Sequence, residues 1–211
     1  MSGSSAVFVD RDGTLIRDVG YLRRADQIEV LPRVPEAIQL LRQHSLKVVV
    51  LTNQSAVARG FLTPEELERI HEELKRRLAR EGAFLDAIYC CPHHPTEGAG
   101  PYRVSCECRK PQDGLARRAQ AELNLDLRRS YVVGDQPSDM ELASRIGVKG
   151  ILIRNEEGER PSPIPSPIGR GLGRGATGSR GREGTDFLVV KDLWEAAQWI
   201  VQDFKRGEDK S

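Results

Sequence analysis

A strong net charge, long apolar runs and widely spaced cysteines are all missing from this sequence of 211 residues. Lysine and arginine number 32 against 31 aspartate and glutamate residues, so no overall charge attracts the chain to nucleic acid or to a membrane surface. No apolar run reaches the roughly 20 residues of a transmembrane helix. The amino terminus also lacks the basic start and apolar core of a signal peptide, so we expect a protein located in the cytoplasm.

The few cysteines of the chain gather in one region, at Cys90, Cys91, Cys106 and Cys108. In a reducing compartment this clustering favours a metal site over a disulfide framework. Three thiolates and one imidazole fill a tetrahedral Zn²⁺ shell and leave no position for water. We therefore predict a structural zinc site, in a loop at residues 91–111, formed by Cys91, His93, Cys106 and Cys108. Cys90, at the end of a predicted strand, and His94, off the paired spacing, are left out of this shell.

Short apolar runs alternate with amphipathic segments along most of the chain. This alternation predicts an α/β fold, with a mainly parallel sheet covered by helices on both faces. The expected strands are residues 6–9, 47–51, 86–90, 131–133, 151–153 and 187–190. The expected helices are residues 35–43, 63–82, 113–123, 138–146 and 193–204.

Two carboxylates, Asp10 and Asp12, follow the first predicted strand directly. An ordinary acidic turn would also explain this pair on its own. Polar residues, however, follow other strands in the same way, and parallel strands place their carboxyl ends at one edge, where ligands bind. We expect the following residues to meet there: Asp10, Asp12, Thr52, Asn53, Arg109, Lys110, Asp135 and Asp139. Carboxylates for Mg²⁺, a hydroxyl and fixed positive charges together suit the transfer of a phosphoryl group.

Residues 156–185 differ in kind, because prolines give way to a run rich in glycine and arginine with almost nothing to bury. We predict an exposed or disordered insertion in a single domain that spans residues 1–206. Its arginines would allow weak contact with RNA, which would make the chain a zinc-dependent interaction module instead of an enzyme. Aromatic residues for base stacking are absent from the segment, so we do not expect nucleic acid as a partner.

Four motifs together resemble the haloacid dehalogenase (HAD) superfamily of phosphohydrolases: Asp10-x-Asp12-Gly13-Thr14, Thr52-Asn53, Lys110 and Gly134-Asp135-x-x-x-Asp139. The resemblance implies a three-layer α/β/α Rossmann-like fold. It implies that Asp10 is the nucleophile, that Asp12 is the general acid and base, and that Thr52 and Lys110 stabilise the phosphoryl group. It also implies Mg²⁺ bound by Asp10, the Asp12 carbonyl and Asp135, with Asp139 in support.

Within the superfamily, the cysteine-rich loop is similar to a group with a minimal cap and a zinc loop. This group contains the heptose-bisphosphate phosphatases, which the motifs match best, and the histidinol-phosphate phosphatases. The match implies removal of the 7-phosphate from a small phosphorylated sugar. We expect the chain to act as a monomer. It implies substrate contacts from Asp18, Val19, Gly20, Tyr21, Asn53, Gln54, Ser55, Arg109 and Gln136. Gln136 departs from the group, which usually has lysine there, and the missing charge bears on substrate preference.

Overall fold

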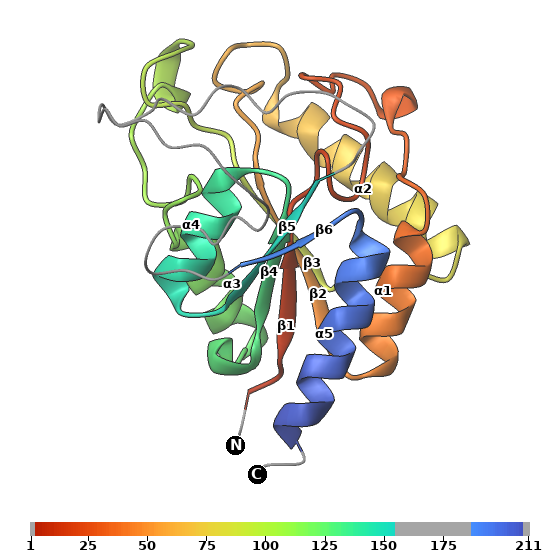
Figure 1. The fold of residues 1–211 in the computed structure, drawn as a ribbon. Helices are drawn as coiled ribbons and strands as arrows, with labels where there is room; N and C mark the ends of the chain where they lie inside the picture. The colour runs from red at the N-terminus through yellow and green to blue at the C-terminus, as the bar shows by residue number, and fades with distance from the viewer. Residues whose placement is uncertain (1–2, 155–186, 209–211) are drawn as a thin grey trace, which may run out of the picture.

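The computed structural model describes residues 3–154 and 187–208. Its centre is a parallel sheet of six strands in the order β3-β2-β1-β4-β5-β6 (Figure 1). The strands are β1 (Ala6–Val9), β2 (Lys47–Asn53), β3 (Ala87–Cys91), β4 (Tyr131–Gly134), β5 (Lys149–Ile153) and β6 (Leu188–Val190). The predicted parallel α/β fold is confirmed.

Among the described residues, five α-helices connect or follow the strands: α1 (Val34–Gln43), α2 (Pro64–Arg80), α3 (Gly114–Leu123), α4 (Pro137–Ile146) and α5 (Leu193–Glu208). Three short 3₁₀ turns, which the sequence analysis did not predict, lie at η1 (Ala25–Gln27), η2 (Gly100–Tyr102) and η3 (Leu127–Arg129). The start of α2 follows its sequence closely, because the Thr63 hydroxyl accepts from the Glu66 amide and the Glu66 carboxylate accepts from the Thr63 amide.

Alternate residues of each strand face opposite sides of the sheet and build two cores. Val7, Val9, Val48 and Val50 pack with α1, α2 and α5 on one side, whereas Phe8 and Val49 pack with α3 and α4 on the other. Figure 1 shows these two groups of helices on opposite sides of the strands. The result is the predicted three-layer sandwich.

Two strand boundaries differ from the prediction in a way that matters for the site. Strand β2 continues to Asn53, because Thr52 and Asn53 still pair with Cys90 and Cys91 of β3. Strand β3 ends one residue later than predicted, so Cys91 is its last residue and faces the opposite side of the sheet from Cys90. Polar residues therefore lie inside the strand ends, where an apolar pattern cannot reveal them.

The last strand and helix complete the same sheet. Strand β6 pairs with β5, and Trp194 and Trp199 of α5 pack against the core, Trp199 edge-on to Tyr131. The predicted insertion at residues 156–185 lies outside the described residues. Within residues 3–154 and 187–208, none of the helices combines the length and the apolar character that crossing a membrane requires.

Candidate active site

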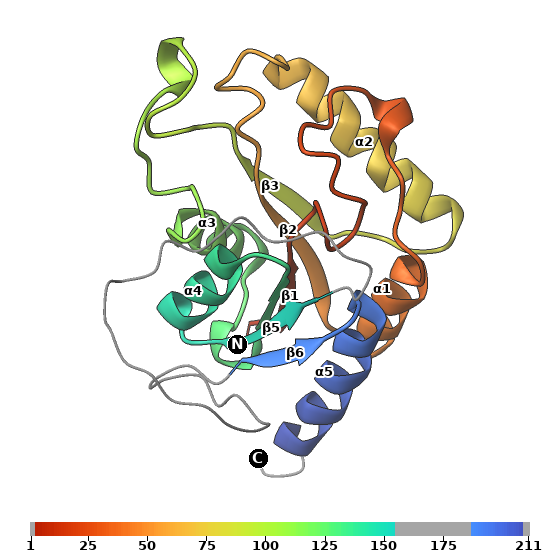
Figure 2. The same ribbon diagram turned by 45° about the horizontal axis from the view of Figure 1, so that its top comes forward.

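The chain changes direction across the sheet between β1 and β4. It leaves β1 toward β2 and β3, then returns to the other side of β1 as β4, so the carboxyl ends of β1 and β4 form a topological switch point. Asp10 follows β1 and Asp135 follows β4, and the Asp10 amide donates to the Val133 carbonyl at 3.0 Å. Figure 2 shows the loops that follow β1, β2 and β3 rising on this same side of the sheet.

Three carboxylates meet at this switch point. One oxygen from each of Asp10, Asp135 and Asp139 lies within 4.8 Å of the others. Two glycines permit this approach: a Cβ on Gly13 would lie 2.3 Å from Oδ2 of Asp135, and one on Gly134 would lie 2.2 Å from Oδ2 of Asp139. The glycines next to both aspartate motifs are therefore required by the packing of the acids themselves.

The pKa values of two of these acids are raised. Burial, together with the charge of Asp10, raises the pKa of Asp135 to about 7. Burial likewise raises the pKa of Asp139 to about 6, although Lys110 opposes this rise. Oδ1 of Asp135 is buried and accepts no hydrogen bond from any described residue. Such a set of crowded oxygens, one of them unpaired, fits a hard divalent cation.

Lys110 supplies a buried positive charge to this cluster. Its Nζ lies 2.7 Å from Oδ1 of Asp10 and 2.7 Å from Oδ1 of Asp139. Burial alone would lower the pKa of Lys110, but the carboxylates of Asp10 and Asp139 raise it above its ordinary value. The side chain of Asn53 fixes the backbone of Lys110, because Oδ1 accepts from the Lys110 amide at 3.0 Å and Nδ2 donates to its carbonyl at 3.1 Å.

Asp12 lies beside the cluster and is held by two side chains. Its carboxylate accepts from Arg11, at 2.8 and 2.9 Å from Nη2, and from Nε2 of Gln54 at 2.8 Å. The same Nε2 of Gln54 donates to Thr52 at 2.8 Å. Gln54, predicted to contact substrate, thus directs its amide at Asp12 and Thr52. Burial raises the pKa of Asp12, against the effect of Arg11.

The predicted substrate residues differ in their exposure to solvent. Asp18, Val19 and Gly20 are exposed, and the Gly20 amide donates to Asp18 at 2.8 Å in a tight turn. Tyr21 is half-buried and stacks edge-on to Phe61 at 4.9 Å between ring centroids. Ser55 is half-buried as well.

Two further predicted substrate residues make contacts inside the protein. Arg109 is half-buried and donates to the His93 carbonyl at 3.0 Å. Gln136 directs its amide to Oδ2 of Asp135 at 2.8 Å. Gln136 therefore contacts a member of the carboxylate cluster through a neutral amide. A lysine at this position would bring a positive charge instead.

The four predicted zinc ligands form a compact cluster at the end of β3. The Sγ of Cys108 lies 3.2 Å from that of Cys106, 3.3 Å from that of Cys91 and 3.3 Å from Nδ1 of His93. Cys90 and His94 do not belong to the cluster. Nδ1 of His94 instead accepts from the Glu97 amide at 2.9 Å. Three sulfurs and one imidazole nitrogen at these separations fit a single tetrahedral metal ion.

Comparisons with known proteins agree with this geometry. An HAD-hydrolase-like family model matches residues 107–167. The chain is 42% identical over 151 residues to the D-glycero-beta-D-manno-heptose-1,7-bisphosphate 7-phosphatase of Yersinia pestis, covering 71% of this chain and 80% of that protein. The chain belongs to this family of HAD-like hydrolases. The Haemophilus ducreyi member is 38% identical over 169 residues, covering 77% of this chain and 92% of its own length.

A solved structure extends the family relationship to nearly the whole chain. The D,D-heptose 1,7-bisphosphate phosphatase of B. bronchiseptica, complexed with magnesium and phosphate, superposes with a TM-score of 0.71 and 30% identity. The match covers 94% of this chain and 99% of that one. The presence of magnesium in that relative agrees with the donor set of Asp10, Asp135 and Asp139 in this chain.

The sequence motifs gave no role to two buried residues near Asp12. Arg11 and His71 are 1% and 2% exposed, and Nη1 of Arg11 lies 3.3 Å from Nε2 of His71. His71 interrupts the apolar stripe of α2 between Leu67 and Leu74, all three being buried. A polar residue on an apolar helix face was the available signal, but the sequence does not show which group it contacts.

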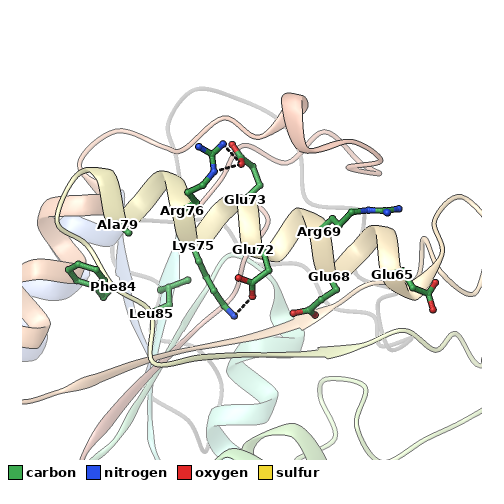
Figure 3. Close-up of a pocket in the computed structure, with 10 residues that line it drawn as sticks. All are labelled: Glu65, Glu68, Arg69, Glu72, Glu73, Lys75, Arg76, Ala79, Phe84 and Leu85. Carbon is green, nitrogen blue, oxygen red and sulfur yellow. Dashed lines mark hydrogen bonds and ion pairs between the residues drawn. The ribbon is translucent and has the colours of Figure 1, made fainter.

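A separate groove of about 860 Å³ runs along the outer side of α2 (Figure 3). Charged side chains border it, including the ion pairs Lys75–Glu72 and Arg76–Glu73, with Phe84 and Leu85 at one end. None of its lining residues belongs to the predicted site. The groove is therefore separate from the carboxylate cluster at the sheet edge.

Proposed function

We propose that this chain is a magnesium-dependent phosphatase that removes the 7-phosphate of D-glycero-D-manno-heptose 1,7-bisphosphate and leaves heptose 1-phosphate. The observation that carries the proposal is the position of Asp10 at the switch point, ion-paired to Lys110 and grouped with Asp135 and Asp139. This constellation occurs in a chain that is 42% identical to a heptose-bisphosphate phosphatase. The substrate is the one that the relatives' names give.

Hydrolysis of a phosphate monoester needs a nucleophile, neutralisation of charge and a proton donor together. Asp10 is the nucleophile: its carboxylate attacks phosphorus, the bond to the sugar oxygen breaks, and an aspartyl-phosphate forms. Asp12 protonates the departing oxygen and then takes a proton from the water that hydrolyses the aspartyl-phosphate. Lys110 and Thr52 stabilise the phosphoryl oxygens. These roles are the ones that the resemblance to the HAD phosphohydrolases implies for the four motifs.

Mg²⁺ belongs with Asp10, the Asp12 carbonyl and Asp135, and Asp139 supports this shell. The bound ion would neutralise the charge that the nucleophile and the phosphate bring together. Zn²⁺ belongs with Cys91, His93, Cys106 and Cys108, and its role is structural. When bound, Zn²⁺ would hold the loop that carries Arg109 and Lys110 to the sheet edge.

The remaining parts of the proposal concern the substrate and the whole chain. The turn at Asp18–Tyr21, with Ser55 and Arg109, contacts the sugar and the retained 1-phosphate. Asn53, Gln54 and Gln136 act mainly by placing Lys110, Asp12 and Asp135. We further propose one domain over residues 1–206, interrupted by the segment at 156–185, working as a monomer in the cytoplasm.

The experiment is phosphorus NMR of the reaction with each anomer of the heptose bisphosphate in the presence of Mg²⁺. Loss of the 7-phosphate signal with retention of the 1-phosphate signal is expected. Asp10→Asn removes the nucleophile and should abolish turnover while the protein remains folded. A kcat/KM for histidinol phosphate equal to or above that for the heptose bisphosphate would overturn the choice of substrate, and full activity of Asp10→Asn would overturn the nucleophile.

A further inference from the structure

Arg11 is buried next to the proton-transferring Asp12, yet no step of the proposed reaction uses it. Its guanidinium contacts three side chains from three segments: Asp12 after β1, Gln54 after β2 and His71 in α2. Only 1% of Arg11 is exposed, so water cannot solvate its positive charge. Loss of any of these contacts is therefore costly, because water cannot replace the lost hydrogen-bond partner of a buried guanidinium.

The contacts leave Asp12 little freedom on the protein side. Nη2 of Arg11 donates to both carboxylate oxygens, and Oδ2 also accepts from Gln54. Gln54 itself cannot turn, because its Oε1 accepts from Arg11 at 2.8 Å and its Nε2 also donates to Thr52. The Asp12 side chain remains 25% exposed, so part of the carboxylate stays accessible to solvent.

His71 forms the far end of this chain of contacts. Arginine has only donors, so at 3.3 Å from Nη1 of Arg11 the ring nitrogen Nε2 must be the acceptor, and the proton of a neutral ring lies on Nδ1. Burial first, and then the charges of Arg11 and Lys75, lower the pKa of His71 to about 3, which keeps the ring neutral and able to accept. His71 is thus a fixed acceptor in an apolar helix face.

We propose that His71 and Gln54 are positioning residues, which hold Arg11 so that it fixes the Asp12 carboxylate in place for proton transfer to the leaving oxygen. The inference rests on the proposed role of Asp12. It does not depend on which phosphate ester is the natural substrate. It extends the active site by one layer, from the sheet edge into the buried face of α2.

The consequence is a dependence on the leaving group. An alkoxide such as a sugar oxygen is a poor leaving group and needs the proton of Asp12, a contribution of about 10²–10⁴-fold. A nitrophenolate leaves without it. Misplacing a catalytic group by about 1 Å can cost about 10²-fold. A defect in positioning Asp12 should therefore slow alkyl esters and spare aryl esters, whereas a general loss of folding or of metal should slow both alike.

The test compares His71→Leu, which removes the acceptor, with His71→Gln, whose side-chain carbonyl can take the place of Nε2. For each variant, kcat/KM is measured with a sugar phosphate and with p-nitrophenyl phosphate, since this constant reports steps up to departure of the leaving group. We expect His71→Leu to lower kcat/KM about 10–100-fold for the sugar phosphate and less than about 3-fold for the aryl ester. His71→Gln should recover most of the loss.

Arg69→Leu, on the exposed side of α2, is the matched control and should leave both constants near those of the unchanged protein. Equal losses for both esters, or equal behaviour of the leucine and glutamine variants, would overturn the positioning role. Lack of any effect in His71→Leu would overturn it as well. Failure on heptose bisphosphate alone, with the ratio between alkyl and aryl esters still altered, would instead count against the proposed substrate and not against this inference.

Discussion

The ammonium group of Lys110 lies 2.7 Å from carboxylate oxygens of both Asp10 and Asp139, and the lysine is 5% exposed. This relationship joins the end of the cysteine-rich loop to the carboxyl end of β1 and to the first turn of α4. Asn53 holds the backbone of the same lysine from β2. One residue therefore connects the cysteine-rich loop, Asp10 and the carboxylate cluster, so we expect its removal to affect both stability and catalysis.

Lys110→Met should inactivate the enzyme and destabilise the metal-free protein. Removing one partner of a buried ion pair leaves the other charge uncompensated, at a cost of about 3–5 kcal/mol. Urea denaturation in the presence of a chelator measures this loss. Arg117→Met is the control, because Arg117 pairs with Asp113 on the surface and such pairs contribute about 0–1 kcal/mol. Equal losses in the two variants would contradict the importance of burial.

Gly13→Ala should weaken binding of Mg²⁺ specifically. Gly13 has a φ of 75°, and an added Cβ would lie 2.3 Å from Oδ2 of Asp135, so this carboxylate must move. We expect the Mg²⁺ concentration for half-maximal activity to rise about 10–100-fold, as for other disturbances of metal-supporting contacts. A titration of activity with Mg²⁺ measures the shift.

Gly147→Ala is the matched control for this change. Gly147 has a φ of 72°, and a Cβ there meets nothing within 4 Å. Both alanine variants should lose about 1 kcal/mol of stability from the left-handed backbone, but only Gly13→Ala should alter the Mg²⁺ requirement. A similar Mg²⁺ shift in both would assign the effect to backbone strain.

The sequence was sufficient for those parts of the molecule that depend on local pattern. Strands such as β1 and β4 are buried on both faces and therefore read as uninterrupted apolar runs. The cysteine cluster was predictable because its ligands come as two close pairs along the chain. The edge where Asp10 and Asp135 meet followed from parallel strands having their carboxyl ends on one side.

Contacts between distant segments could not be predicted in this way. The Arg11–His71 contact joins residues 60 positions apart, and no spacing rule relates them. The resemblance implied substrate contacts from Gln54 and Gln136, but it gave no indication that their amides also contact Asp12 and Asp135. A strand end places a residue at the edge of the sheet, but the neighbouring side chains decide where its polar atoms point.

Disruption of the cysteine cluster should reduce catalysis through Lys110. Cys106→Ser removes one of the four ligands, so the loop that ends at Lys110 loses its anchor at the end of β3. We expect loss of bound zinc and at least about a 10-fold fall in kcat with saturating Mg²⁺. Zinc content by elemental analysis and activity measure the two effects. Cys90→Ser, outside the cluster, should keep its zinc, and a fall in zinc there would contradict the ligand set.

The metal-free protein should become less stable as the pH rises from about 4 to about 7. The folded chain raises the pKa of Asp135 from 3.8 to about 7 and that of Asp139 to about 6, so both acids favour the protonated form when folded. Their contribution is fully present below the pKa of the unfolded chain and is lost as the pH passes the folded pKa. Urea midpoints between pH 4 and 8 in the presence of a chelator measure the slope.

Two controls test whether these acids cause the slope. Asp135→Asn cannot ionise at this position and should make the slope flatter. Saturating Mg²⁺ should do the same in the unchanged protein, because the cation compensates the negative charges that form as the pH rises. A slope that persists in Asp135→Asn with undiminished steepness would show that other groups cause it.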